Sequence, residues 1–266
     1  MVARAAAAGV RLLALTDHDT VAGVGEAALA AERIGVRLVA GVEISAVDPS
    51  HGDLHLLGYV IDDHQALLRE RLRRYREDRK RGAGLMARAL TELGFELDRA
   101  ELRAHAAAGR SIGRPHLAQA VVAAPANAER LRAEGCLEAS FFLREYLAQG
   151  RPGFRPRTVP SVPEAISAIH DAGGVAVWAH PFWDVSDPLQ VLATIDRFRS
   201  LGLDGVECFY PSHDRRQAEL LAERCDELGL LSTGSSDFHG PAHRHFSSFR
   251  AFSTHGRRPA LGPIGE

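Results

Sequence analysis

The chain has 266 residues, of which 45% are hydrophobic and 25% charged, and its formal net charge is -2. These values are typical of a soluble globular protein with one barrel-sized domain or two smaller domains. The near-neutral charge and the lack of any apolar run of roughly 18 residues argue against a membrane or stable duplex nucleic acid as a partner. The chain has three cysteines without C-x-x-C spacing, and we expect reduced thiols of a cytoplasmic protein: Cys136, Cys208 and Cys225.

The first 64 residues alternate between helical and strand-like patterns. A helix is predicted over Val2 to Ala8 and a strand over Val10 to Leu15. An amphipathic helix, Val24 to Ile34, and a second strand, Val36 to Ile44, follow, and His51 to Asp63 supplies a third strand. The short connections predict a βαβ unit with parallel neighbouring strands.

The middle of the chain, residues 65–159, shows apolar residues at helical spacing and no convincing strand. We therefore predict three parts: residues 1–64 and 160–266 form one α/β domain, and residues 65–159 are a helical insertion in it. The stretch rich in proline and glycine from Gly150 to Pro163 is the expected return linker. Further helices are predicted at Arg99 to Ala108, Pro115 to Val122, Ala126 to Glu134 and Phe141 to Gln149.

Alternation of helices and strands then resumes. Ser161 and Glu164 have the spacing of a capping box, which predicts the start of a helix. A final strand is expected at Phe246 to Phe252, and the tail after it is expected to be poorly ordered. The elements between are predicted as helix Val162 to Ala172, strand Val175 to Trp178, helix Leu189 to Leu201, strand Gly205 to Cys208, helix Arg215 to Leu228 and strand Leu230 to Thr233.

Five apolar runs end in, or carry, residues that can bind a metal. Because the carboxyl ends of strands in α/β proteins meet at one rim, scattered side chains of this kind can form one cluster. We therefore predict a metal site there. The candidates are Asp17 and His18 in LTDHDT, Glu43 in GVEIS, His55 in LHLLGY, His180 in AHP, and Asp237 with His239 in SSDFHG.

Each candidate also has a structural interpretation. Asp237 and His239 would otherwise cap a helix or turn, which we favour less than a metal-binding role, and for His55 taken alone a core histidine is the more common explanation. The backbone of His180 is expected to be extended, because proline follows it. Glu43 follows a buried run, where an unpaired carboxylate is costly, so a metal or an arginine must satisfy it.

The stretch SIGRPH, Ser111 to His116, is typical of a helix start with proline in the first turn. Backbone N–H groups at such an end, together with Arg114, favour a bound phosphate. An ordinary helix start with an arginine ion pair fits the pattern equally well.

These motifs together resemble the PHP family, the polymerase and histidinol phosphatase superfamily. The similarity covers nearly the whole chain and keeps the family's order. The matching segments are TDHDT at 16–20, GVEIS at 41–45, HLLGY at 55–59, GRPH at 113–116, AHP at 179–181 and SDFHG at 236–240.

The resemblance implies a distorted (β/α)7 barrel, a TIM-like α/β fold with an α-helical insertion. It also implies up to three divalent metal ions, Mn²⁺ first and Mg²⁺, Fe²⁺ or Zn²⁺ as alternatives, and a small phosphorylated nucleotide (a 3',5'-nucleoside bisphosphate) or the 5' end of a short RNA as substrate. By motif, Arg114 and His116 would hold the phosphate, and the catalytic residues would be Asp17, His18, Asp237 and His239. The implied metal ligands are His18, Glu43, His55, His180, Asp237 and His239.

The chain departs from the family at its start. The family opens with a strand carrying H-x-H, whereas Met1 falls inside the helix that should follow that strand, so we expect the first strand to be missing. One alternative function is therefore a non-catalytic nucleotide-binding or metal-binding domain. Another is an amidohydrolase-like barrel, although its carboxylated lysine is hard to place because Lys80 is the only lysine.

Overall fold

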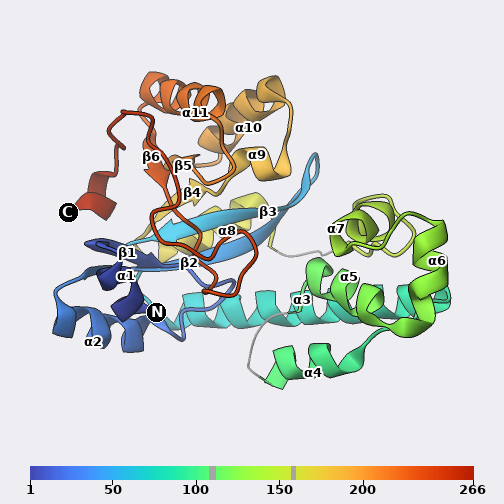
Figure 1. Ribbon diagram of the computed structural model, residues 1–266. Coiled ribbons are helices and arrows are strands. Elements are labelled where there is room, and N and C mark those ends of the chain that lie inside the picture. The colour runs from blue at the N-terminus through green and yellow to red at the C-terminus, as the bar shows by residue number, and fades with distance from the viewer. Residues whose placement is uncertain (108–111, 157–159) are drawn as a thin grey trace. The chain divides into compact units, whose positions relative to one another are not determined.

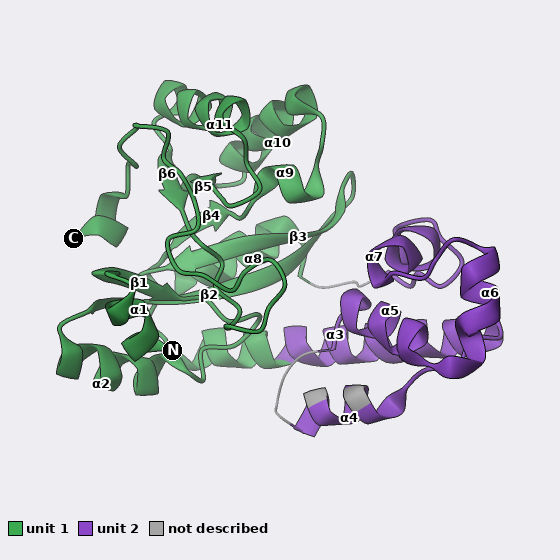
Figure 2. Cartoon of the chain, in the orientation of Figure 1, with its two compact units in different colours: residues 1–73, 160–266 green, residues 74–159 purple. Residues whose placement is uncertain are grey.

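A computed structural model describes residues 1–107, 112–156 and 160–266 (Figure 1). The chain divides into two compact units, which are coloured separately in Figure 2. Unit 1 consists of Met1–Arg73 and Pro160–Glu266, and unit 2 of Arg74–Val159. Helix α3 (Ala66–Glu92) begins in unit 1 and carries the chain into unit 2.

Unit 1 is built on one curled sheet of six strands in the order β1-β2-β3-β4-β5-β6 (Figure 1). The pairs β1–β2, β4–β5 and β5–β6 are parallel, whereas β3 runs antiparallel to both β2 and β4. The fold is therefore mixed α/β. The strands are β1 (Leu12–Leu15), β2 (Arg37–Asp48), β3 (Gly52–Tyr59), β4 (Val175–Trp178), β5 (Gly205–Phe209) and β6 (Leu231–Gly234).

Strand β2 extends to Asp48, four residues beyond the predicted end at Ile44. It gains this length because β2 and β3 form a hairpin, in which Asp48 pairs with Gly52. The carboxylate of Asp48 holds the turn, since its Oδ2 accepts the backbone N–H of Ser50 (3.0 Å) and of His51 (3.1 Å).

Helices cover the sheet of unit 1. Helices α1 and α2 pack against each other, α8 packs on β2, β3 and β4, and α11 packs on β5 and β6. The predicted capping box of α8 is confirmed, because Glu164 accepts the backbone N–H of Ser161 at 2.8 Å. The helices are α1 (Val2–Ala7), α2 (Val24–Ile34), α8 (Val162–Asp171), α9 (Pro181–Asp184), α10 (Pro188–Ser200) and α11 (Arg215–Leu228).

The C-terminal segment differs from the prediction. Residues 246–252 form no strand, since Arg250 has a left-handed backbone (φ 59°) that interrupts an extended chain. The tail expected to be poorly ordered instead ends in a 3₁₀ helix, η3 (Gly262–Gly265). Ile264 is buried against the apolar side chains of the sheet, and the Arg37 guanidinium donates to its carbonyl at 2.8 Å. These contacts explain why a segment rich in glycine and proline is held in place.

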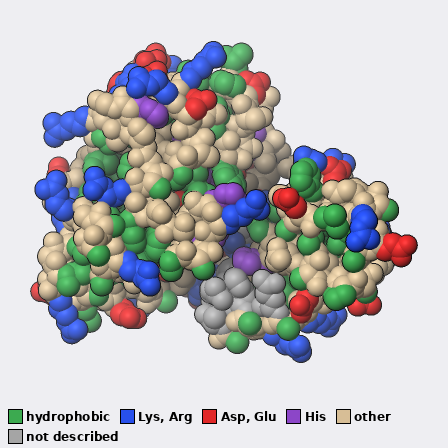
Figure 3. Space-filling view, viewed as in Figure 1, with side chains coloured by type: hydrophobic (Ala, Val, Ile, Leu, Met, Phe, Trp, Pro, Cys, Tyr) green, Lys and Arg blue, Asp and Glu red, His purple; other side chains and the backbone are tan. Residues whose placement is uncertain are grey.

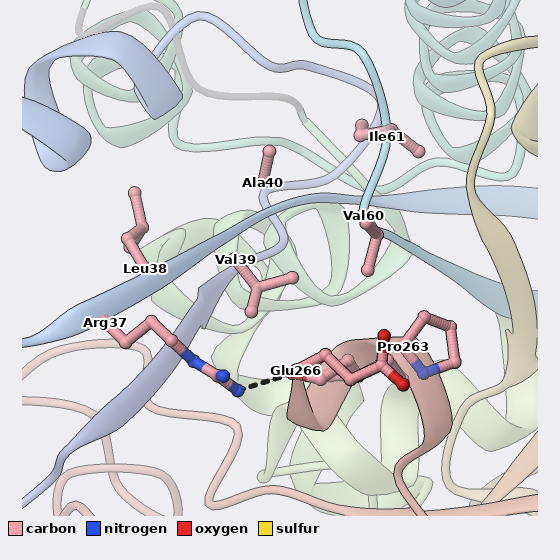
Figure 4. Close-up of a pocket in the computed structure, with 9 residues that line it drawn as sticks. Arg37, Leu38, Val39, Ala40, Val60, Ile61, Pro263 and Glu266 are labelled. Carbon is pink, nitrogen blue, oxygen red and sulfur yellow. Dashed lines mark hydrogen bonds between the residues drawn. The ribbon is translucent and has the colours of Figure 1, made fainter.

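The tail also closes one side of a cavity of about 250 Å³ (Figure 4). Its lining includes Arg37 and Leu38 at the start of β2, Val60 after β3, and Glu266. The candidate site residues are absent from this lining. The cavity therefore lies apart from the predicted chemistry.

The secondary structure of unit 2 is helical, and no strand occurs among its described residues. A buried aromatic group lies in its core, where the Phe95 ring meets the Phe142 ring at 5.0 Å and the Tyr146 ring at 4.8 Å. The Arg130 guanidinium covers the Phe95 ring at 3.8 Å. Besides α3, its elements are α4 (Arg99–Ala107), α5 (Arg114–Ala123), η1 (Pro125–Asn127), α6 (Ala128–Ala133), α7 (Ala139–Phe142) and the π-helical turn η2 (Leu143–Leu147).

Candidate active site

Glu43 is the centre of the candidate site. It lies on β2 with 6% of its surface exposed, and three histidines from other elements surround its carboxylate. His55 Nδ1 lies 2.8 Å and His180 Nε2 3.4 Å from Glu43 Oε1, and His18 Nδ1 lies 3.5 Å from Oε2. The structure therefore brings together four of the residues that the sequence singled out.

The charge state of Glu43 follows from this environment. Burial by itself would raise the pKa of the carboxyl, but the charges of His18 and His55 and the hydrogen bonds from His180 and His55 hold it well below its ordinary value. Glu43 is therefore an anion in the folded protein. An anion ringed by imidazoles is a suitable donor for a divalent cation.

Three of these side chains lie close enough together to be candidate ligands of one metal ion. One ligand atom each from His18, Glu43 and His55 can be chosen so that all three lie within 4.8 Å of one another. Imidazole nitrogen and carboxylate oxygen are ligands that Mn, Fe and Zn share. The donor set thus fits the divalent metal that the sequence predicted.

Backbone contacts fix His18 beside β2. Asp19 donates its N–H to the Glu43 carbonyl (2.8 Å), and Glu43 donates its N–H to the Asp17 carbonyl (3.2 Å). Asp19 is fully buried with φ 54°, and its carboxylate accepts the Ser45 N–H at 3.0 Å. A non-glycine residue in this conformation is strained, and such strain is common at functional sites.

His180 follows β4, but its backbone is not extended as predicted. Its φ of 32° and ψ of 57° are left-handed. The backbone N–H of His180 donates to Glu207 Oε2 at 3.0 Å, which holds this conformation against the preference imposed by Pro181. Burial lowers the pKa of His180, but Glu43 and Asp184 outweigh it and raise the pKa to about 9.

Asp237 and His239 follow β6 and lie next to these histidines. The rings of His18 and His239 are 6.4 Å apart between centroids. Asp237 has φ 48°, and its Oδ2 accepts the Tyr210 hydroxyl at 2.7 Å. His239 Nδ1 lies 2.7 Å from the Asp237 carbonyl oxygen, so the backbone of one candidate orients the ring of the other.

Asp17 also belongs to this group electrostatically. Burial of its carboxyl raises the pKa, the charge of His239 lowers it, and the charge of Glu43 raises it again, with a net shift upward. Asp17 therefore holds a proton more readily than an ordinary aspartate.

Sequence reasoning missed Glu207, although the signal was present. Glu207 lies in the apolar strand GVECF with 1% of its surface exposed, the same setting that singled out Glu43. Burial raises its pKa to about 7, against the charge of His180 and a hydrogen bond with Ser235. Tyr210, the partner of Asp237, was missed as well, because a tyrosine after a strand resembles an ordinary core residue.

Arg114 and His116 lie in unit 2, at the start of α5. The predicted helix start is confirmed: Gly113 precedes the helix, and its N–H donates to His116 Nδ1 at 3.0 Å. The Arg114 guanidinium lies 5.9 Å from the centre of the Phe154 ring. Ser111, the first residue of the predicted phosphate motif, lies outside the described residues. The phosphate-binding role of this motif stays a prediction.

On the surface, Lys and Arg side chains are interspersed with Asp and Glu over the described residues of the face seen in Figure 3. This face therefore carries no continuous basic patch. Among the described helices, none combines the length and the apolar character that crossing a bilayer requires.

No family model matches the chain. Several curated relatives match it over most of its length. A 5'-3' exoribonuclease of Haemophilus influenzae is 32% identical over 246 residues, which is 91% of this chain and 84% of the relative. A 3',5'-nucleoside bisphosphate phosphatase of Chromobacterium violaceum is 33% identical over 251 residues, 91% of this chain and 81% of the relative. A phosphoribosyl 1,2-cyclic phosphate 1,2-diphosphodiesterase of Eggerthella lenta is 29% identical over 238 residues, which is 89% of this chain and 86% of the relative.

Solved structures agree with these relatives. A protein from Chromobacterium violaceum named an amidohydrolase, with bound sulfate and no metal, matches with a TM-score of 0.74 and 31% identity over 91% of this chain and 81% of that chain. A protein from Bifidobacterium adolescentis named as a metal-dependent phosphoesterase matches with a TM-score of 0.73 and 30% identity over 94% of this chain and 84% of that chain. Given these relatives and the cluster around Glu43, the chain belongs to the PHP family of phosphoesterases, which are hydrolases.

Proposed function

We propose that this protein hydrolyses phosphate esters of small nucleotides, such as 3',5'-nucleoside bisphosphates, or of the 5' ends of short RNA. The observation that carries the proposal is the cluster of His18, Glu43 and His55, whose ligand atoms lie within 4.8 Å of one another. The names of the relatives support the substrate class, since they describe a nucleoside bisphosphate phosphatase and exoribonucleases.

The cofactor in this proposal is a set of up to three divalent metal ions, with Mn²⁺ the first to test. The proposed ligands are His18, Glu43, His55, His180, Asp237 and His239. A bound divalent metal would supply a water of lowered pKa and would neutralise the phosphoryl oxygens. Glu43 is already ionised without metal, whereas His180, whose pKa is about 9, would release a proton when it binds a cation.

The side chains around this cluster have separate proposed roles. Asp17, which directly precedes the proposed ligand His18, would take part in proton transfer to the leaving oxygen. Tyr210 would keep Asp237 in place through the 2.7 Å hydrogen bond. Glu207 would hold the backbone of His180 through its N–H.

We also propose a barrel architecture for unit 1. The six-stranded sheet and the matched structures support a distorted (β/α)7 barrel interrupted by a helical insertion over residues 65–159. The assignment of Arg114 and His116 to the substrate phosphate rests on the sequence motif.

The decisive experiment is phosphate release from 3'-phosphoadenosine 5'-phosphate with and without added Mn²⁺. We expect release that a chelator abolishes, that Mn²⁺ restores, and that Glu43→Gln and Asp237→Asn each reduce at least 100-fold, since each removes a charged ligand. Glu32→Gln, an exposed carboxylate on α2, is the matched control and should be fully active. Release that persists in the chelator would contradict the metal-dependent mechanism. Binding of Mn²⁺ and nucleotide without release would show a binding domain instead.

A further inference from the structure

Trp183 is a large aromatic side chain that is exposed to solvent close to the candidate site. It lies on the short helix α9, three residues after His180, and 57% of its surface is exposed. The other tryptophan, Trp178 on β4, is fully buried. A single exposed apolar residue needs no explanation by itself, so the surroundings of Trp183 decide its meaning.

These surroundings are an aromatic cluster with Phe246 at its centre. The Phe246 ring is buried, and its centroid lies 5.8 Å from that of Trp183 and 5.3 Å from that of His243, which is stacked on it at 19°. Such spacings are those of contacting aromatic rings. Trp183, Phe246 and His243 therefore form one surface, here called the aromatic platform, with a buried base and exposed edges.

The aromatic platform is continuous with the candidate metal ligands. The Phe246 ring lies 5.6 Å from the His239 ring and 5.7 Å from the Tyr210 ring, whose hydroxyl holds Asp237. The His239 and His243 rings are 5.1 Å apart. A planar group on the platform would thus lie within a few side-chain contacts of the place where a phosphate ester would be cleaved.

The chemistry of the platform selects among occupants. Every nucleobase has a flat π-face, and stacking on aromatic side chains is how single-stranded nucleotides are commonly held without reading their sequence. A nucleotide carries a planar base and a phosphate joined by a ribose. Its base could therefore stack on the aromatic platform while its phosphate reaches the candidate metal site.

We propose that Trp183, with Phe246 and His243, binds the nucleobase of the substrate by stacking. This inference rests on the proposed function, which supplies the nucleotide substrate, and it adds the group that distinguishes a nucleotide from other phosphate esters. Because the contact is stacking, purine substrates are bound more tightly than pyrimidine substrates, and no single base is required.

The test compares two substrates, 3'-phosphoadenosine 5'-phosphate and the 3',5'-bisphosphate of a ribose analogue that lacks the base. We expect Trp183→Ala to raise KM for the nucleotide roughly 5- to 150-fold with kcat nearly unchanged, and to leave KM for the base-free compound as it was. Trp183→Phe should recover part of the loss. Leu29→Ala, an equally exposed apolar residue on α2, is the matched control and should change neither KM.

A second measurement needs no turnover. Titration of the metal-free protein with the same nucleotide should quench the fluorescence of Trp183, and Trp183→Phe, which retains only the buried Trp178, should remove most of the change. Metal-dependent turnover with equal KM in wild type and Trp183→Ala would overturn the stacking inference alone. No turnover by the wild type, together with quenching at Trp183, would overturn the proposed hydrolysis and leave the stacking site standing. No quenching at saturating nucleotide would overturn the stacking site whatever the activity.

Discussion

The buried carboxyl of Glu207 predicts how the stability of the metal-free protein changes with pH. Its pKa is raised from 4.5 to about 7 by burial, so between these values the folded state holds a proton that the unfolded state has released. Below pH 4.5 the carboxyl of Glu207 is protonated in both states, so its shifted pKa does not lower the free energy of unfolding. As the pH rises from 4.5 toward about 7, the free energy of unfolding falls. The whole shift corresponds to ~3 kcal/mol of unfolding free energy.

The variant Glu207→Gln isolates this effect. Glutamine keeps an oxygen that can accept the His180 N–H, which is 3.0 Å from Glu207 Oε2, but it does not titrate. The pKa of His180 is also raised, from 6.5 to about 9, so its stabilising contribution is lost only as the pH rises from 6.5 toward 9. Measurements between pH 5 and 6.5 therefore report mainly on Glu207.

Urea unfolding in the presence of a chelator is the assay. Over this pH interval we expect the wild type to lose about 2 kcal/mol of unfolding free energy relative to Glu207→Gln. The exposed control Glu32→Gln should follow the wild type. If wild type and Glu207→Gln change in parallel with pH, the carboxyl does not carry the proton assigned to it, and the reasoning fails.

Three further predictions concern single contacts. Arg197→Ala should lower the free energy of unfolding in urea by about 3 kcal/mol, because it removes the guanidinium that lies 2.6 and 3.0 Å from the buried carboxylate of Asp48; a loss below 1 kcal/mol would contradict this. Ile264→Ala should lower the free energy of unfolding by roughly 2–4 kcal/mol and make the tail more sensitive to proteases, because the Ile264 side chain packs against the apolar side chains of the sheet. Proteolysis at the wild-type rate would contradict this packing. Tyr210→Phe should weaken Mn²⁺ binding in calorimetry roughly 10- to 100-fold at unchanged fold, and equal affinity would show that Asp237 needs no hydrogen bond from the hydroxyl.

Local patterns predicted most elements of this fold. The helix Val24–Ile34 and the strand Val175–Trp178 have the bounds expected from apolar periodicity and from the glycines that follow the helix and precede the strand. The pattern at the strand ends also identified His18, Glu43 and His55, because an ionisable group next to a buried run is costly without a partner.

Features that depend on distant partners were not predictable in this way. The left-handed backbone of His180 depends on Glu207, which is 27 residues further along the chain. The tail was misjudged because its many glycines and prolines say nothing about Ile264, whose burial requires the assembled sheet. Residue propensities describe a segment in isolation. The backbone of His180 and the position of the tail depend instead on contacts with other parts of unit 1.

The antiparallel pairing of β3 with β4 has a consequence for the order of folding. Strands β1, β2 and β3 are joined by short segments, but β3 and β4 are neighbours separated by residues 60–174, so their pairing closes a long loop. Contacts of this range form late. His18, Glu43 and His55 all belong to the early half, whereas His180 and Asp237 arrive only with the late half. We therefore expect three of the proposed metal ligands to come together before this loop closes, so that stopped-flow refolding with Mn²⁺ should detect metal binding before activity.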